Sequence, residues 1–217
     1  MLLYDVKMFQ STLNFLTSLV FAVFSTFGIN TGTEQPRHDV VERLGSQIEI
    51  RRYVPRVAAE TIVDTEKTDN PRGDAFRIVA GYIFGANKQR QKIDMTAPVE
   101  VQSASTKIAM TAPVEIDKSD RKLIMRFFMP SQYKMSELPE PNDPRVKLIE
   151  LPAATVAVLQ FSGSTNDAAV FEKTAELLKT LEGTKWKIAG TATALFYNPP
   201  WTIPFLRRNE VLVAVSQ

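Results

Sequence analysis

The chain has 217 residues, a net charge of +2 and 44% hydrophobic residues, which fits one sizeable soluble domain or two small ones. So small a charge, without runs of Lys or Arg, argues against a nucleic-acid partner. The absence of cysteine excludes disulfides, thiolate metal sites and a cysteine nucleophile, and a catalytic triad or ordinary zinc site would have to use the single histidine, His38.

The N-terminal segment, residues 1–30, is apolar. Residues 13–29 carry no charged side chain, a length that is short for a membrane-spanning helix and somewhat long for the core of a signal peptide. Three interpretations therefore stay open: a signal sequence, an uncleaved anchor, or an apolar helix packed on the domain. A signal sequence or an anchor predicts an exported or membrane-associated protein, and an anchor could place it in a larger membrane complex. A packed helix predicts a cytoplasmic protein.

Two strands and a helix are predicted after a polar linker, residues 30–37. Residues 48–54 and 56–63 are rich in β-forming residues and meet at Pro55, which suits a bend or a strand edge. A helix is predicted from Asp74, as its N-cap, to the residue before Gly85. Its buried stripe, at spacing i, i+3, i+4, i+7, is predicted to be Phe76, Val79, Ala80 and Ile83.

A nonapeptide, Lys-Ile-Xaa-Met-Thr-Ala-Pro-Val-Glu, occurs twice, at residues 92–100 and 107–115. Apolar and polar residues alternate in both copies, which predicts two strands paired through a short loop. Ile93 and Met95 would then lie on one face, and Thr96 and Glu100 on the other. The repetition is interpreted as matched strands rather than two active sites.

The order of elements in the first half recurs in the second. After a strand at 122–129 and a proline-rich connector, strands are predicted at 146–151 and 155–161, a helix at 166–181, and strands at 188–197 and 211–215. A displacement of 97 residues carries Pro55 onto Pro152. We therefore predict two β-β-α-β halves that close into one antiparallel sheet or distorted barrel of the α+β class, with the helices outside.

Several short motifs resemble one family. They are Tyr-Ile-Phe-Gly-Ala-Asn at 82–87, Lys-Ile-Asp-Met-Thr-Ala-Pro-Val at 92–99, Phe-Met-Pro-Ser at 128–131, Gln-Phe-Ser-Gly at 160–163 and Arg-Arg-Asn-Glu at 207–210. In this order, over residues 36–217, they resemble the SOUL haem-binding protein family. The resemblance implies a pseudo-two-fold, distorted eight-stranded antiparallel β-barrel flanked by two helices. It also implies non-catalytic binding of haem or other porphyrins, as carrier, buffer or sensor.

The first helix carries the predicted binding residues. Ile78 and Tyr82 lie four positions apart outside the core stripe, which predicts one wall of a groove, or else a helix buried on two sides. By resemblance, Arg77 occupies the position of a basic residue associated with a haem propionate, and Gly81 stands where another member has a lysine.

Iron ligands are less clear in the sequence. His38 is a candidate axial ligand, where relatives usually have an aromatic residue, and Met95 and Met110 offer thioether sulfur. Surface or core packing is the alternative for all three. The default expectation is haem held mainly by hydrophobic contact, with weak or absent ligation by the protein.

Two other functions compete with haem binding. The predicted architecture also resembles the gyrase-inhibitor-like fold, some members of which hydrolyse small molecules. A glutamate acting with a tyrosine would do this chemistry; the candidates are Glu60, Glu100, Glu115, Tyr53, Tyr82 and Tyr197. Glu100 and Glu115 are expected on the outward, solvated strand face. The third hypothesis is an interaction module tethered to a membrane through residues 13–29.

Overall fold

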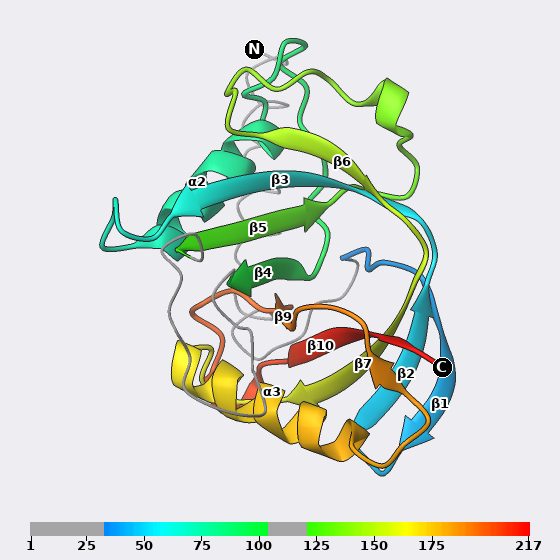
Figure 1. Ribbon diagram of the computed structural model, residues 1–217. Helices are drawn as coiled ribbons and strands as arrows, with labels where there is room; N and C mark the ends of the chain where they lie inside the picture. The colour runs from blue at the N-terminus through cyan, green and yellow to red at the C-terminus, as the bar shows by residue number, and fades with distance from the viewer. Residues whose placement is uncertain (1–32, 104–120) are drawn as a thin grey trace, which may run out of the picture.

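The computed structural model describes residues 33–103 and 121–217. Within these ranges two α-helices pack on a ten-stranded antiparallel sheet (Figure 1). The helices are α2 (Pro71–Ile83) and α3 (Asp167–Leu181). The strands are β1 (His38–Leu44), β2 (Ile48–Tyr53), β3 (Arg56–Asp64), β4 (Val99–Ser103), β5 (Lys122–Phe128), β6 (Lys147–Leu151), β7 (Ala154–Phe161), β8 (Lys187–Ile188), β9 (Thr193–Phe196) and β10 (Asn209–Ser216).

The strand order confirms the predicted pseudo-two-fold arrangement. It runs β1-β2-β7-β10-β9-β4-β5-β3-β6, with β8 paired to β10. Outward from the central β9–β4 pair, β10, β7 and β2 on one side correspond to β5, β3 and β6 on the other. The halves are interlocked, because β2 pairs with β7 while β3, beyond the bend at Pro55, pairs with β6. The sheet curls into a half-barrel, with β1 and β6 as its edges in the described part of the chain (Figure 1).

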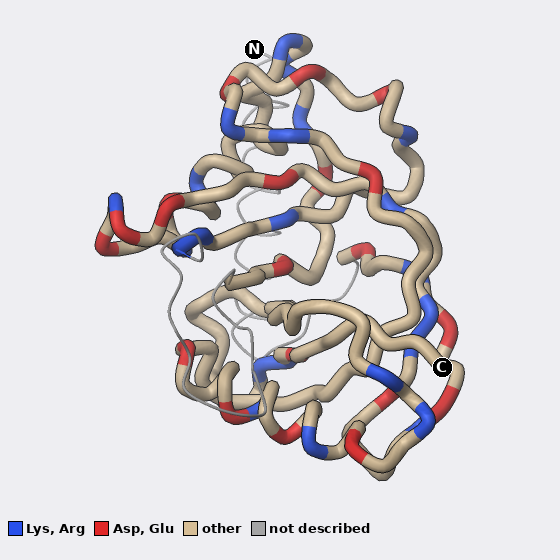
Figure 2. The backbone as a smooth tube through the Cα atoms, viewed as in Figure 1, with Lys and Arg blue, Asp and Glu red and all other residues tan. Residues whose placement is uncertain are grey.

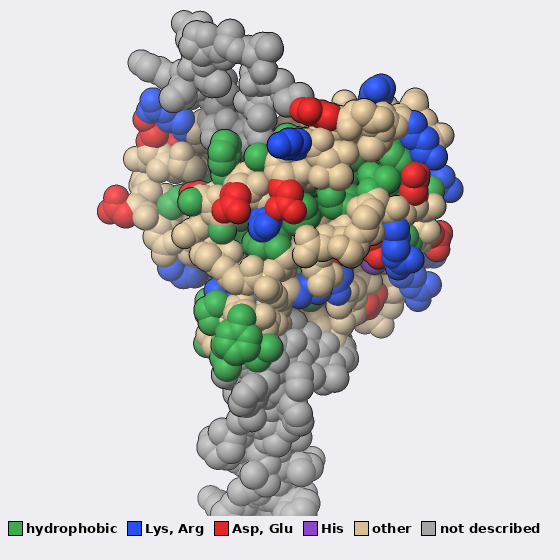
Figure 3. All heavy atoms as spheres, turned by 90° about the horizontal axis from the view of Figure 1, so that it is seen from below, with side chains coloured by type: hydrophobic (Ala, Val, Ile, Leu, Met, Phe, Trp, Pro, Cys, Tyr) green, Lys and Arg blue, Asp and Glu red, His purple; other side chains and the backbone are tan. Residues whose placement is uncertain are grey.

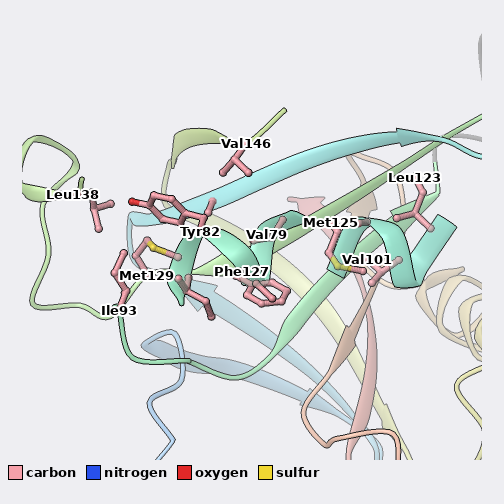
Figure 4. Close-up of a cluster of buried hydrophobic side chains, with 14 residues drawn as sticks. Val79, Tyr82, Ile93, Val101, Leu123, Met125, Phe127, Met129, Leu138 and Val146 are labelled. Carbon is pink, nitrogen blue, oxygen red and sulfur yellow. The ribbon is translucent and has the colours of Figure 1, made fainter. Parts of the chain in front are cut away.

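Three apolar clusters hold this sheet. The first lies between α2 and the β3–β5–β4 part of the sheet and includes Val79, Tyr82 and Phe127 (Figure 4). The second packs α3 against β2, β7 and β10. The third lies on the opposite, concave face and includes Phe128 and Tyr197. The strands between the edge strands β1 and β6 in the sheet order therefore bury both faces over part of their length, which is why the period-two pattern is weak in much of the sequence.

The predicted strand across the first nonapeptide is wrong for most of its length, because β4 begins only at Val99. Pro98 cannot donate a ladder hydrogen bond, and the residues before it bond elsewhere. The Thr96 hydroxyl donates to the Phe128 carbonyl at 2.6 Å, and the Ala97 N–H donates to the Glu34 carbonyl at 2.9 Å. Thr96 is therefore buried and Met95 exposed, the reverse of the strand prediction. The second copy lies outside the described residues.

The first helix begins earlier than predicted. Its N-cap is Asn70, whose side-chain oxygen accepts from the Gly73 N–H at 3.0 Å, and Pro71 occupies the first helical position. The predicted cap, Asp74, lies inside the first turn. Phe76, predicted in the core, is 41% exposed, and its ring reaches only the edge of the core, 5.3 Å from that of Phe127.

Two further predictions concern the second half and the N-terminus. The strand predicted at 188–197 is interrupted, because only β8 and β9 pair within it. Residues 13–29 lie outside the described ranges. Among the residues that are described, no helix combines the length and apolarity needed to cross a membrane.

Candidate functional site

A groove of about 630 Å³ lies beside α2, at the point where the sheet loses a strand. β6 pairs with β3 only along Arg56–Glu60, so the residues of β3 beyond Glu60 have an open edge on that side. The chain leading into β6 and helix α2 form the two walls of the gap. The apolar part of the lining consists of Ile62, Val63, Ile78, Gly81, Tyr82, Ala86 and Val146.

The structure brings four sequence-predicted residues together here, since Arg77, Ile78, Gly81 and Tyr82 all line this groove. Ile78 is partly exposed, as a groove wall requires. A side chain added at Gly81 would start 3.9 Å from the Ala86 Cβ, an ordinary contact, so Gly81 leaves room rather than serving the backbone. Ile78 thus lines a groove, whereas Tyr82 lies mainly in the core cluster, as the alternative of a helix buried on two sides predicts.

Tyr82 lies mainly in the core cluster that packs against this wall of the groove. It is only 1% exposed, and its hydroxyl donates to the Pro139 carbonyl at 2.9 Å, in the cluster beneath the groove (Figure 4). Burial raises the pKa of the Tyr82 phenol to about 12, so the phenol stays neutral near pH 7. The hydroxyl is thus held by a protein partner, the Pro139 carbonyl.

The rim of the groove carries three basic side chains, each with a carboxylate beside it. The Arg77 side chain is 69% exposed, and its guanidinium can meet a second carboxylate from solvent. Exposed pairs of this kind contribute little to stability, so exchanging partners costs little. The pairs are Arg77 with Asp74, Arg145 with Asp143, and Lys67 with Asp64.

Neither His38 nor Met95 lies at this groove, whose lining among the described residues contains neither His nor Met. His38 begins β1, where its ring lies 4.9 Å from that of Tyr53 and its Nδ1 lies 3.2 Å from the Pro36 carbonyl oxygen. Met95 is exposed on the segment before β4, and Met110 lies outside the described residues. In the described ranges, no three His, Cys, Asp or Glu residues gather as a metal site.

The concave face carries a buried ionic network that sequence reasoning missed. Glu210 is fully buried and accepts from Arg51 at 3.0 and 3.2 Å, from Arg208 at 2.7 and 3.1 Å, and from the Tyr197 hydroxyl at 2.7 Å. Figure 2 shows such acidic and basic positions on strands of the sheet as well as on its loops. Although burial opposes it, Arg51 and Arg208 hold the pKa of Glu210 below its usual value.

A second network lies on the other half of the same face. Arg126 bonds the carboxylates of both Glu60 and Glu100. Glu100 is 5% exposed, so the prediction that it is solvated is wrong. Its side chain lies on the buried concave face and not on the outward face. Glu115 lies outside the described residues. The carboxylates of Glu60 and Glu100 are thus both paired with Arg126.

The fold and the groove together define an α+β ligand-binding domain with an apolar pocket under a charged rim. Residues 33–214 match the family described as SOUL heme-binding protein, and the chain belongs to that family. This confirms the predicted family and, with it, haem as the cofactor that the family binds. Heme-binding protein 1 of Sus scrofa is 30% identical over 150 residues, 67% of this chain and 74% of that protein. Its counterpart in Mus musculus is 32% identical over 151 residues, with the same coverage.

Solved structures share the fold at much lower identity. The C-terminal domain of EcmrR has a TM-score of 0.55 at 9% identity, covering 79% of this chain and 98% of its own. An uncharacterized conserved protein from Listeria innocua reaches 0.56 at 11% identity, and a hydrolase from Listeria innocua reaches 0.52 at 11%. Each of these two covers 86% of this chain and 94% of its own. Identities this low establish a common fold and nothing about activity.

Proposed function

We propose that this protein binds haem or a related porphyrin in the groove beside α2, as a non-catalytic carrier, buffer or sensor. The observation that carries the proposal is the convergence of Arg77, Ile78, Gly81 and Tyr82 on one apolar groove in a member of a haem-binding family. Its volume, about 630 Å³, lies within the usual range for small-molecule sites.

The chemistry of the lining fits an amphiphilic plate. Ile62 and Ile78 offer apolar contact, and Gly81 leaves the space between helix and ligand open. A macrocycle with two carboxylates on one edge would place them at the rim, within the field of Lys67, Arg77 and Arg145. The ring system would supply hydrophobic contact area, which is the larger part of the binding energy in this arrangement.

Iron ligation has no part in the proposal. Among the described residues, the groove lining provides neither imidazole nor thioether, and its tyrosine, Tyr82, has its hydroxyl bonded to Pro139. Binding should then depend on the shape of the porphyrin and on its carboxylates, and little on the metal. His38 stays a sequence-based hypothesis for a ligand, since it lies beside Tyr53, away from these residues.

Catalysis is not proposed, although one contact is of the kind that a hydrolase would use. Tyr197 donates to Glu210 at 2.7 Å. Burial raises the pKa of Tyr197, and the two arginines lower the pKa of Glu210, so at neutral pH the pair holds its proton on the phenol with no weakly held proton to transfer. These shifts support a structural role for the pair.

The test is an absorbance titration with haemin of the full chain and three variants. Arg77→Ala should weaken haemin binding about tenfold, the scale of one charge-assisted contact. Gly81→Leu should weaken it more, because the added side chain enters the groove. Gly81→Ala is the matched control and should bind like the natural chain. Equal affinity in all four proteins would remove this groove from the proposal.

We also propose membrane association through residues 13–29 as the localisation, on the basis of their uncharged sequence alone. Fractionation of cells that produce the full chain, beside a chain lacking residues 1–30, tests it. A full-length protein found in the soluble fraction with its N-terminus intact would contradict a membrane tether.

A further inference from the structure

A second groove, of about 520 Å³, shares no residue with the one beside α2. It lies where the two proline bends of the interlocked halves meet the end of β5, and Pro55, Pro152 and Phe128 line it. Val57, Met129 and Leu151 add apolar surface. Three basic side chains also line it, namely Arg37, Arg56 and Lys134, together with the acidic Glu34 and Glu150.

Arg56 has unsatisfied hydrogen-bonding groups. Its Nε and Nη1 are buried and find no hydrogen-bond partner within the described residues. The guanidinium lies over two aromatic rings instead, 4.7 Å from the centroid of Tyr53 and 5.1 Å from that of Phe128. Aromatic rings attract a cation but accept no strong hydrogen bond from its N–H groups. Leaving buried donors of a charged group unpaired is unfavourable, and proteins rarely do so without a reason.

The other arginines of the concave face that carry these networks have carboxylate partners. Arg51 and Arg208 bond Glu210, and Arg126 bonds Glu60 and Glu100. Glu100 is the carboxylate whose charge acts on Arg56, but its oxygen is already engaged by Arg126. Burial accordingly lowers the pKa of Arg56, whereas the pKa of Arg126 is raised because its carboxylate partners outweigh its burial.

We propose that this second groove binds an organic monocarboxylate, an acid group on an apolar body, with Arg56 as the residue that recognises the carboxylate. The acid supplies an acceptor for the Arg56 guanidinium, first at Nη2, because Nε and Nη1 are closed to solvent in this structure and would meet the acid only after the side chain turns toward the groove. A planar guanidinium matches a carboxylate in geometry. The apolar part would extend along Val57, Met129 and Leu151. A small inorganic anion would leave this surface uncovered, which is why we assign an amphiphilic acid.

This inference is independent of haem binding in the groove beside α2. Arg56 is not among the residues that line that groove, and Arg77 is not among those that line this one. Loss of one ligand by substitution should therefore leave the other in place.

The experiment is calorimetric titration of the full chain with decanoate, decanol and inorganic phosphate. Decanoate should bind at least about tenfold more tightly than decanol, the contribution of one charge-assisted contact. The Arg56→Met variant should lose the preference for decanoate over decanol and should bind haemin as tightly as the natural chain does. Arg52→Met, which changes an exposed arginine of β2, is the matched control and should keep the preference.

Three results would overturn the proposal: no decanoate binding, equal affinity for decanoate and decanol, or an unchanged preference in Arg56→Met. Phosphate binding that competes with decanoate and exceeds it in affinity would overturn the ligand class. The comparison of decanoate with decanol uses the natural chain, so it holds even if Arg56→Met does not fold. Failure of haemin to bind would count against the proposed function alone.

Discussion

Glu210→Gln is expected to destabilise the fold strongly, although the substitution keeps the size and shape of the side chain. Glu210 is 0% exposed and accepts five hydrogen bonds, two from Arg51, two from Arg208 and one from Tyr197. Glutamine presents an NH2 group to donors and removes the negative charge between two guanidinium groups. Arg51, which is 4% exposed, would then be a buried cation without its counter-ion.

The magnitude follows from this burial. Removing one partner of a buried ion pair costs about 3–5 kcal/mol, because the remaining charge stays desolvated. With a typical urea m-value of about 1–3 kcal/mol per molar, the unfolding midpoint should fall by roughly 1 M or more. Glu176→Gln is the matched control. Its partner Lys173 lies 2.7 Å away on the surface of α3, and losing an exposed pair costs less than about 1 kcal/mol.

The effect should also depend on pH with a definite sign. The arginines lower the pKa of Glu210 below the usual 4.5, so its ionised form stabilises the folded state above that pH. This stabilisation is lost as pH falls through the lowered pKa. The difference in free energy of unfolding between the natural chain and Glu210→Gln should be largest near pH 7 and shrink below pH 4. A midpoint shift under about 0.3 M urea at pH 7, with an unchanged m-value, would refute this account of the network.

Two further predictions concern the porphyrin and the helix cap. Metal-free protoporphyrin IX should bind with an affinity within about threefold of that of haemin, and haemin affinity should not change from pH 6 to 9. The reason is that the described groove lining has no histidine and the Tyr82 phenol stays neutral. Fluorescence and absorbance titrations measure both affinities, and much tighter binding of haemin would point to an iron ligand. Asn70→Ala should lower the free energy of unfolding by about 1 kcal/mol in urea titration. Asp69→Ala, a neighbouring substitution, should change it by much less, and equal effects would contradict the cap assignment.

Local patterns predicted the elements of this fold well. The order of strands, proline bends and helices followed from periodicity, and Arg77, Ile78, Gly81 and Tyr82 do share a groove. The failures arise where long-range contacts overrule the local pattern. Thr96 is buried because its hydroxyl bonds the Phe128 carbonyl, 32 residues away.

The ionic network around Glu210 could not be predicted from the sequence for the same reason. Glu210 meets Arg51 across 159 positions, a separation at which spacing carries no information. The motif Arg-Arg-Asn-Glu at 207–210 marked the place without revealing its partners. Likewise, the groove beside α2 exists because β6 stops pairing at Glu60, and only the assembled sheet defines where a strand ends.

The pseudo-symmetry supplies an internal comparison for the groove beside α2. A displacement of 98 residues carries the buried residues Val79, Ala80 and Ile83 of α2 onto Leu177, Leu178 and Leu181 of α3, which are also buried. The core faces of the two helices therefore correspond. The displacement of 98 that relates them is one residue longer than the 97 that relates Pro55 to Pro152.

On their other faces the two helices differ. The same displacement carries Ile78 and Tyr82 of α2 onto Glu176 and Thr180 of α3, which are exposed and polar. α3 lies at the bottom of Figure 1, and the view from below in Figure 3 shows acidic and basic side chains side by side on that face. One helix of the pair thus turns a solvated face outward, while its counterpart lines a groove with apolar side chains. Packing accounts for part of this difference, because Tyr82 belongs to the core cluster and Ile78 packs against it. Ile78, which is only partly buried, also lines the groove, where an apolar ligand would cover it.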